Sequence, residues 1–237
     1  MIDRRGSNGQ RNRILNAMSN ADLALLQPHL EATPLKFRQR LQSANRQVRA
    51  VYFPESGIAS VVAVGGGERR QAEVALVGRE GMTGLPVVHG ADRSPCDVFV
   101  QMEGAGHCIA PENLQQVIEE SATALKVFLR YAHVFAVQSA YTALANARGN
   151  IEERLARWLL MTRDRVDDDE MVLTHEFIAL MLGVRRAGVT GALQAFEGRG
   201  LIETARGSVT VRDRDGLEET ANGLYGVPEA EFERLFG

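Results

Sequence analysis

The stretch from Thr174 to Val211 constrains the fold of this chain more than any other. Thr174 is a good helix N-cap, and Gly183 lies where the helix that follows must end in a left-handed turn. A second amphipathic stretch runs from about Arg185 to Gly198, and two strand-like runs flank Gly207. These parts in this order predict a winged helix-turn-helix. We expect the apolar residues of its first helix to face inward, namely Phe177, Ile178, Leu180 and Met181.

The second helix of this motif presents arginine at the end that would meet the major groove of DNA. Arg185 and Arg186 begin the helix, and arginine can donate two hydrogen bonds to guanine. Between residues 185 and 214, six arginines stand against three acidic residues, which is a local surplus of positive charge. A surface helix hairpin with solvated arginines is the alternative. We predict DNA contacts at Thr174, Arg185, Arg186 and Thr190, the last facing a phosphate.

Residues 48–109 predict short β-strands separated by glycine-containing turns. The clearest strand-like runs are Ile58–Val64, Glu73–Val77 and Val98–Met102. The glycines at 65–67 lack the Lys-Ser/Thr of a phosphate-binding loop and fit a hairpin tip. This pattern indicates a β-sandwich or small barrel. A short helical segment precedes it, with Ser19 or Asn20 as the cap.

A nearly continuous helical stretch follows from Pro111 to Arg165, with a break at Gly149-Asn150. Its two opposite faces are both apolar, so we expect it to be buried on both sides. On one face, apolar residues recur at spacings of three and four, which predicts that this helix packs in parallel against the same helix of a second copy along a seam. An ordinary core helix is the alternative. The seam consists of Leu125, Phe128, Ala132 and Phe135. The break divides the chain into residues 1–149, with the dimerisation helix at about 111–148, and residues 150–237.

Composition and motifs exclude several other classes of protein. The 237 residues are 45% hydrophobic and contain neither a bilayer-spanning apolar run nor a secretory signal, so we expect a cytoplasmic protein with no membrane contact. Two cysteines are too few for a disulfide framework. The acidic run 167–170, the five histidines and the cysteines lack metal-ligand spacing. We expect no metal, no cofactor and no enzyme activity, although a catalytic site built from distant residues is still an alternative.

Over nearly its full length the chain resembles Crp/Fnr-type transcription regulators. The matching segments are Tyr52–Gly57, Arg93-Ser94, Glu153–Leu160 and, most specifically, Leu173–Ile202. The resemblance implies an α+β fold with an N-terminal β-roll like a cyclic-nucleotide-binding jelly roll, a long dimerisation helix and a C-terminal winged helix-turn-helix. It implies a homodimeric, sequence-specific regulator that binds a palindrome in double-stranded DNA, with RNA polymerase as a further partner.

The same resemblance places a candidate effector pocket at Thr83, Arg93, Ser94 and Ser139. Nucleotide-binding members hold the ribose with a Gly-Glu pair, which is Met82-Thr83 here, and Ala140 follows Ser139 in place of a second hydroxyl. The pocket is therefore altered, and we expect it not to bind cyclic AMP tightly. The sequence does not identify another effector. Pairing of Arg93 with an acid such as Glu80 or Asp92 is the structural alternative.

Two further departures bear on DNA readout and on function. Arg186 matches the family's guanine-reading arginine, but Ala187 and Gly191 replace a glutamate and an arginine that commonly read bases. The operator should therefore differ from those of the best-known relatives. The iron–sulfur branch needs four cysteines, and this chain has two. A nucleotide- or small-ligand-sensing module whose main output is not DNA binding is the alternative function.

Overall fold

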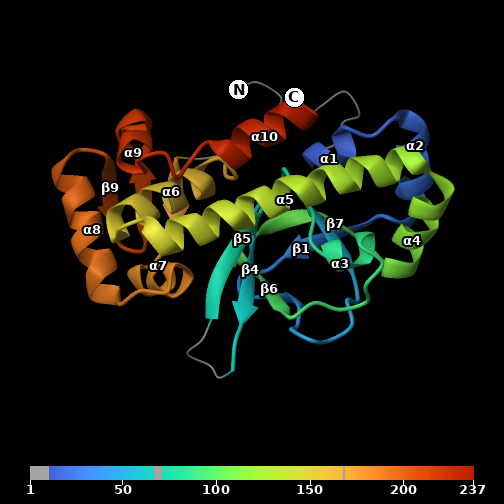
Figure 1. Cartoon of the computed structure of the whole chain (residues 1–237), viewed down its shortest axis with the longest axis horizontal. Helices are drawn as coiled ribbons and strands as arrows, with labels where there is room; N and C mark the ends of the chain where they lie inside the picture. The colour runs from blue at the N-terminus through green and yellow to red at the C-terminus, as the bar shows by residue number, and fades with distance from the viewer. Residues whose placement is uncertain (1–10, 67–70, 168) are drawn as a thin grey trace.

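The computed structural model describes residues 11–66, 71–167 and 169–237. Figure 1 shows a β-rich N-terminal unit at one end of the molecule and a largely helical C-terminal unit at the other, with one long helix crossing both. This arrangement confirms the α+β fold and the order of elements that the sequence predicts.

Two antiparallel sheets form the N-terminal roll. The three-stranded sheet has the order β1-β7-β3 and the four-stranded sheet the order β2-β6-β4-β5. Their strands are β1 (Glu31–Leu35), β2 (Arg40–Gln42), β3 (Val51–Pro54), β4 (Ile58–Val64), β5 (Gln71–Val77), β6 (Cys96–Met102) and β7 (Gly104–Ile109). The helices of this unit are α1 (Arg13–Asn16), α2 (Asn20–Leu26) and α3 (Leu85–Val88), with a short 3-10 turn at Gln27–His29.

The alternating strands were predicted correctly, whereas β1 and β2 were missed because they are short and largely polar. Ser19 caps α2 by accepting a hydrogen bond from the Asp22 amide (3.1 Å), as expected. β4 and β5 pair antiparallel, which agrees with a hairpin, although its predicted glycine tip extends to residue 67, outside the described residues.

The helical stretch after the roll is two helices rather than one up to Arg148. α4 (Pro111–Glu120) ends at Ser121, whose hydroxyl then caps α5 (Ala122–Arg148) by accepting a hydrogen bond from the Ala124 amide (3.1 Å). The prediction of a single helix over 111–148 is wrong for this reason. α5 buries Phe128 and Tyr131 against the roll, so the long helix is part of the N-terminal core.

The C-terminal unit begins with a capped helix. Asn150 and Glu153 form a capping box at the start of α6 (Ile151–Arg163), which separates it from α5 at the predicted break. The remaining elements are β8 (Glu170–Val172), α7 (His175–Leu182), α8 (Arg186–Gly198), β9 (Ile202–Ala205), β10 (Ser208–Val211), α9 (Arg214–Thr220) and α10 (Val227–Phe236). The wing is three-stranded, in the order β8-β10-β9, because β8 adds a strand that the sequence reasoning did not foresee.

The two units pack closely on one another. α10 returns from the C-terminal unit to lie along α5 (Figure 1), and its Phe232 joins the apolar cluster that contains Tyr131. On the other side, the Trp158 indole on α6 donates to the Glu73 carboxylate on β5 (2.7 Å). The units are thus joined by contacts on two sides of the molecule in addition to the chain itself.

Glu73 makes the stability of this packing depend on pH. Its side chain is buried, its Oε2 has no partner among the described residues, and burial raises its pKa to about 7. A raised carboxyl pKa gives stability that is present at low pH and is lost as pH rises through about 7. The rise of the Glu73 pKa from about 4.5 to about 7 corresponds to roughly 3 kcal/mol in the free energy of unfolding.

We expect Glu73→Gln to remove this pH dependence, because glutamine cannot ionise. Urea denaturation between pH 5 and 8 should show the wild type losing up to about 3 kcal/mol relative to the variant. Glu119→Gln, at an exposed position of α4, is the control and should leave the wild-type slope unchanged. A Glu73→Gln variant with the wild-type slope would contradict the burial of an ionisable carboxyl here.

Candidate nucleic-acid interface

The helix-turn-helix is held by a local cap, a left-handed glycine and a shared core. The Thr174 hydroxyl accepts a hydrogen bond from the Phe177 amide (3.2 Å), and Gly183 ends α7 with φ of 63°. Ile178 and Met181 of α7 are buried in one cluster with the inner face of α8, which consists of Val189, Ala192, Leu193 and Phe196. The expectation that Leu180 packs inward is wrong: it lies on the outer side of this eight-residue helix and is 53% exposed.

Arg185 and Arg186 lie at the start of α8 with their side chains exposed. Arg185 is the N-cap residue of the helix but makes no side-chain capping bond. Neither guanidinium forms a hydrogen bond or an ion pair with another residue in the described part of the chain. Arginines elsewhere in this unit do, since Arg212 pairs with Glu203 and Arg214 with Asp164. Both arginines at the start of α8 are therefore available to an outside acceptor.

Thr190 and Thr174 are less free than the sequence predicts. The Thr190 hydroxyl lies 3.0 Å from Nδ1 of His175, the first residue of α7, and is half-buried. The Thr174 hydroxyl is engaged in the cap described above. The Thr190 bond links the start of α7 to α8, whereas the Thr174 bond caps α7 locally. Contact of either threonine with DNA is still a prediction.

The outer face of α8 is nearly free of large side chains. Ala187 and Gly191 are exposed, and a Cβ atom at Gly191 would meet nothing within 4 Å. Gly188 differs, because a Cβ atom there would lie 2.7 Å from the Ile151 side chain. Gln194, one turn beyond Gly191, is exposed on this face and was not singled out from the sequence.

The wing supplies one further exposed cation that sequence reasoning missed. Arg206 lies in the turn between β9 and β10, before Gly207 with φ of 82°. Its side chain is exposed and has no hydrogen-bond or ion-pair partner among the described residues. The available signal in the sequence was an arginine directly before the turn glycine that follows the second helix of the motif.

Each of the four candidate effector residues makes a hydrogen bond within the protein, and their role as a pocket is still a prediction. The Thr83 hydroxyl is buried and accepts from the Tyr52 amide (3.0 Å), and the Ser139 hydroxyl donates to the Phe135 carbonyl (3.0 Å). Ser94 accepts from the Cys96 amide within its own turn. Arg93 is exposed and bonds Asp92 through two nitrogens at 3.0 and 2.9 Å, which is the structural alternative foreseen for it.

The predicted dimer seam is partly turned toward the protomer's own core. Phe128 is fully buried beside Phe53, so it has no surface to offer a second copy, and its assignment to the interface is wrong. Phe135 is half-buried against Tyr131. Leu125 and Ala132 are also half-buried and lie at the edge of the exposed face of α5. That face carries Leu129, Ala136, Ala140, Ala143, Leu144 and Ala147.

Two other kinds of site are absent from the described part of the chain. Its histidine, cysteine, aspartate and glutamate side chains form no group of three or more that could hold a metal ion. Its helices include none with both the length and the apolar composition needed to cross a bilayer.

Comparison with known proteins bears directly on this geometry. The family model of Crp-like helix-turn-helix domains matches residues 153–220, which span α6 to α9. No curated protein sequence matches the chain significantly. Many solved structures share its fold.

One similar structure is a protein from Eubacterium rectale described as a transcriptional regulator of the Crp/Fnr family. It is 19% identical to this chain and has a TM-score of 0.68, and the match covers 89% of this chain and 98% of that chain. FixK2 from Bradyrhizobium japonicum is 15% identical, with coverage of 81% and 96% and a TM-score of 0.69. The c-di-GMP-responsive global regulator CLP of Xanthomonas campestris is 15% identical, with coverage of 81% and 99% and a TM-score of 0.64. The chain therefore has the fold of Crp/Fnr-type transcription regulators, and its residues 153–220 form a Crp-like helix-turn-helix DNA-binding domain.

Proposed function

We propose that this protein is a sequence-specific transcription regulator that binds a palindromic site in double-stranded DNA as a homodimer. The observation that carries this proposal is the pair of exposed, unpartnered arginines at the start of α8, on a helix fixed by a buried core. Guanidinium groups so placed can reach guanine O6 and N7 in the major groove. Arg206 on the wing would add a phosphate contact beside that groove.

Selection of bound sequences from a pool of random duplex DNA tests this function. We expect enrichment of a palindrome whose half-sites lie about one helical turn apart and contain guanine, because a two-fold dimer presents two copies of α8. Recovery of no preferred sequence would contradict the proposal and would favour a ligand-sensing module with another output.

The homodimer would form along the exposed face of α5. This face includes Leu129 and Leu144, which are 46% and 44% exposed, and it is interrupted by the exposed polar side chains of Lys126 and His133. Its small alanines would let two helices approach closely, and Leu125 and Ala132 would lie at the edge of the contact. The predicted pairing along the long helix is thereby kept, but its contact face is rotated away from Phe128 and Phe135.

The division of labour follows from the two cores. Residues 1–149 would form the sensor and dimerisation unit and residues 150–237 the DNA-binding unit, since one large apolar cluster comes mainly from the first part, with Phe232 of α10 added, and another comes mainly from the second. A regulator of transcription would act in the cytoplasm, on DNA and together with RNA polymerase. No step in this function requires catalysis.

We expect cyclic AMP and cyclic GMP not to bind tightly at the position that the family resemblance suggests. Arg93 is already paired with Asp92, Thr83 is held by the β3 backbone, and a short uncharged side chain replaces the ribose-binding carboxylate. Loss of one charge-assisted hydrogen bond weakens binding roughly ten- to a hundredfold. Calorimetry should show no micromolar binding, and DNA should be bound without either nucleotide. Micromolar binding that Arg93→Ala abolishes would restore the family's nucleotide mechanism.

A further inference from the structure

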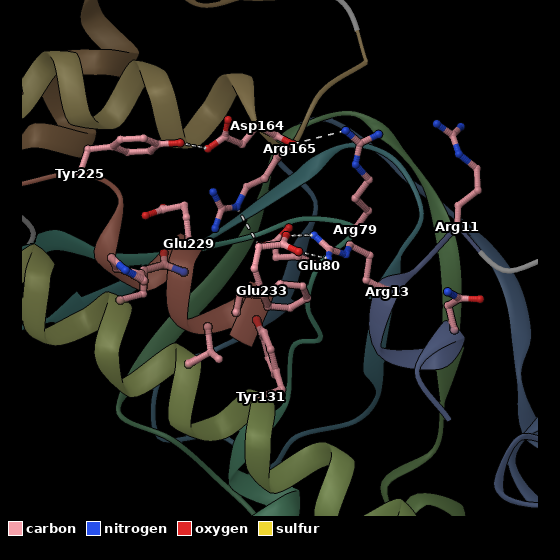
Figure 2. Close-up of a pocket in the computed structure, with 15 residues that line it drawn as sticks. Arg11, Arg13, Arg79, Glu80, Tyr131, Asp164, Arg165, Tyr225, Glu229 and Glu233 are labelled. Carbon is pink, nitrogen blue, oxygen red and sulfur yellow. Dashed lines mark hydrogen bonds and ion pairs between the residues drawn. The ribbon is translucent and has the colours of Figure 1, made fainter. Parts of the chain in front are cut away.

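A cavity of about 550 Å³ lies where the N-terminal segment, α5 and α10 meet, and its walls come from both units of the protein (Figure 2). This volume is in the range of sites for small organic ligands. None of the four candidate effector residues lines it. The walls include an apolar part formed by Val134, Pro228 and Phe232 and a larger charged part.

Three arginines that line the cavity pair with two carboxylates of the C-terminal unit, of which Glu233 lines the cavity and Asp167 lies outside its lining. Arg11 and Arg79 both pair with the Asp167 carboxylate, one on each of its oxygens. Arg13 pairs with Glu233 of α10 through two hydrogen bonds of 2.7 and 3.0 Å. Asp167 therefore bridges two guanidinium groups from separate parts of the N-terminal unit, which is the role that a bound anion would fill.

The deeper part of the cavity is internally compensated. Arg165 donates to Glu80 (2.8 Å), and both side chains are largely buried. The Tyr131 hydroxyl is buried beside them and has no hydrogen-bond partner among the described residues. A ligand that entered would find this hydroxyl unused, whereas it would gain charge only from the arginines nearer the surface.

We propose that this cavity binds a small multivalent anion, which takes the place of Asp167 on Arg11 and Arg79. Guanidinium groups bind phosphate and carboxylate oxygens through paired hydrogen bonds, and a compact anion of two or more charges can satisfy both arginines at once. The competing carboxylates are easily displaced, because Asp167 and Glu233 are 45% and 59% exposed and exposed ion pairs hold weakly.

Anion binding would change how the two units are joined. Arg79 also donates to the carbonyls of Asp164 and Val166, and Arg165 of the same loop pairs with Glu80, so the two ion pairs of Asp167 are part of a larger set of contacts that holds the loop after α6 to the N-terminal unit. Displacing Asp167 would loosen that loop. By thermodynamic linkage, a change that shifts the loop toward its loosened state would raise the affinity for the anion by the same factor. An effect of the anion on DNA affinity rests on the proposed function, whereas anion binding itself does not.

Calorimetric titration with inorganic pyrophosphate at constant ionic strength tests the site in the full-length protein. We expect saturable binding at one site per chain, about tenfold tighter in Asp167→Asn because the competing carboxylate is removed, and about tenfold weaker in Arg11→Gln. Asp169→Asn is the matched control: Asp169 is on the same loop and is also paired with an arginine, Arg163, away from the cavity. It makes the same change in net charge and should bind pyrophosphate as the wild type does.

Hydrogen–deuterium exchange supplies a second readout that does not involve DNA. Pyrophosphate should increase exchange of the backbone amides at 164–170 in the wild type, and Asp167→Asn should show raised exchange without the anion. Equal affinity in Asp167→Asn and Asp169→Asn, unchanged affinity in Arg11→Gln, or no saturable binding in the wild type would each overturn the inference. Absence of DNA binding with intact pyrophosphate binding would instead count against the proposed function alone.

Discussion

Replacing Arg186 by alanine is expected to weaken binding to the selected operator by about 1–3 kcal/mol and to relax the preference at one base pair in each half-site. The physical reason is that the exposed guanidinium at the start of α8 has no partner within the described residues, so in the proposed complex its hydrogen bonds would be made with DNA alone. Competition binding with operators mutated one base pair at a time measures both quantities.

Two matched substitutions separate base readout from general charge. Arg212→Ala lowers the net charge of the same unit by one, but Arg212 already pairs with Glu203 and is not in the first turn of α8, so base preference should be kept. Thr190→Val should weaken binding evenly across sequences, because it removes the bond that joins His175 to α8 rather than a base contact. Wild-type affinity and base preference in Arg186→Ala would show that α8 does not dock through its first turn.

The largest loss of DNA affinity is expected from Leu144→Glu on the exposed face of α5. In a two-fold dimer the new carboxylate would be buried beside its copy in the partner, and two unpaired buried charges disfavour association strongly. Light scattering should show a monomer where the wild type is a dimer. A monomer binds one half-site, and the loss of the second contact lowers affinity by at least about a hundredfold.

Phe37→Glu is the control for this experiment, since Phe37 is also an exposed apolar residue, at 52%, but lies far along the chain from α5. It should leave the dimer and DNA binding intact. Phe135 is unsuitable for the test because its ring packs on Tyr131 within the protomer, so a charge there would damage the core itself. A wild-type monomer at working concentration would remove the proposed dimer altogether.

Local signals were sufficient for the winged helix-turn-helix. The Thr174 cap and the left-handed Gly183 act within one turn of chain, and the buried face of α8 repeats at helical spacing, so each feature depends on near neighbours in sequence. The strands β4, β5 and β6 were predictable for the same reason, as alternation and turns are short-range properties, whereas the glycines at 104 and 106 favour a turn and made the start of β7 look like one. Arg186 could be placed in the first turn of α8 because the start of that helix was itself predictable from local signals.

Long-range contacts decided what local patterns could not. The repeat at Leu125, Phe128, Ala132 and Phe135 is the same whether its partner is a second subunit or the chain's own roll, and only the packing of β3 against α5 shows that Phe128 is enclosed.

The bond of the Thr83 hydroxyl to the β3 backbone likewise joins residues far apart in the sequence, whereas the pairing of Arg93 with Asp92 is local and was among the alternatives read from the sequence. The cavity is lined by residues from parts of the chain as far apart as α1 and α10. The ion pair of Arg79 with Asp167 also joins residues more than 80 positions apart. The sequence by itself therefore predicted most of the elements and placed Arg185 and Arg186 at the start of α8 through interactions within a few residues. The tertiary structure alone decided which charges and apolar faces meet across the two units, because those pairings depend on how the whole chain packs.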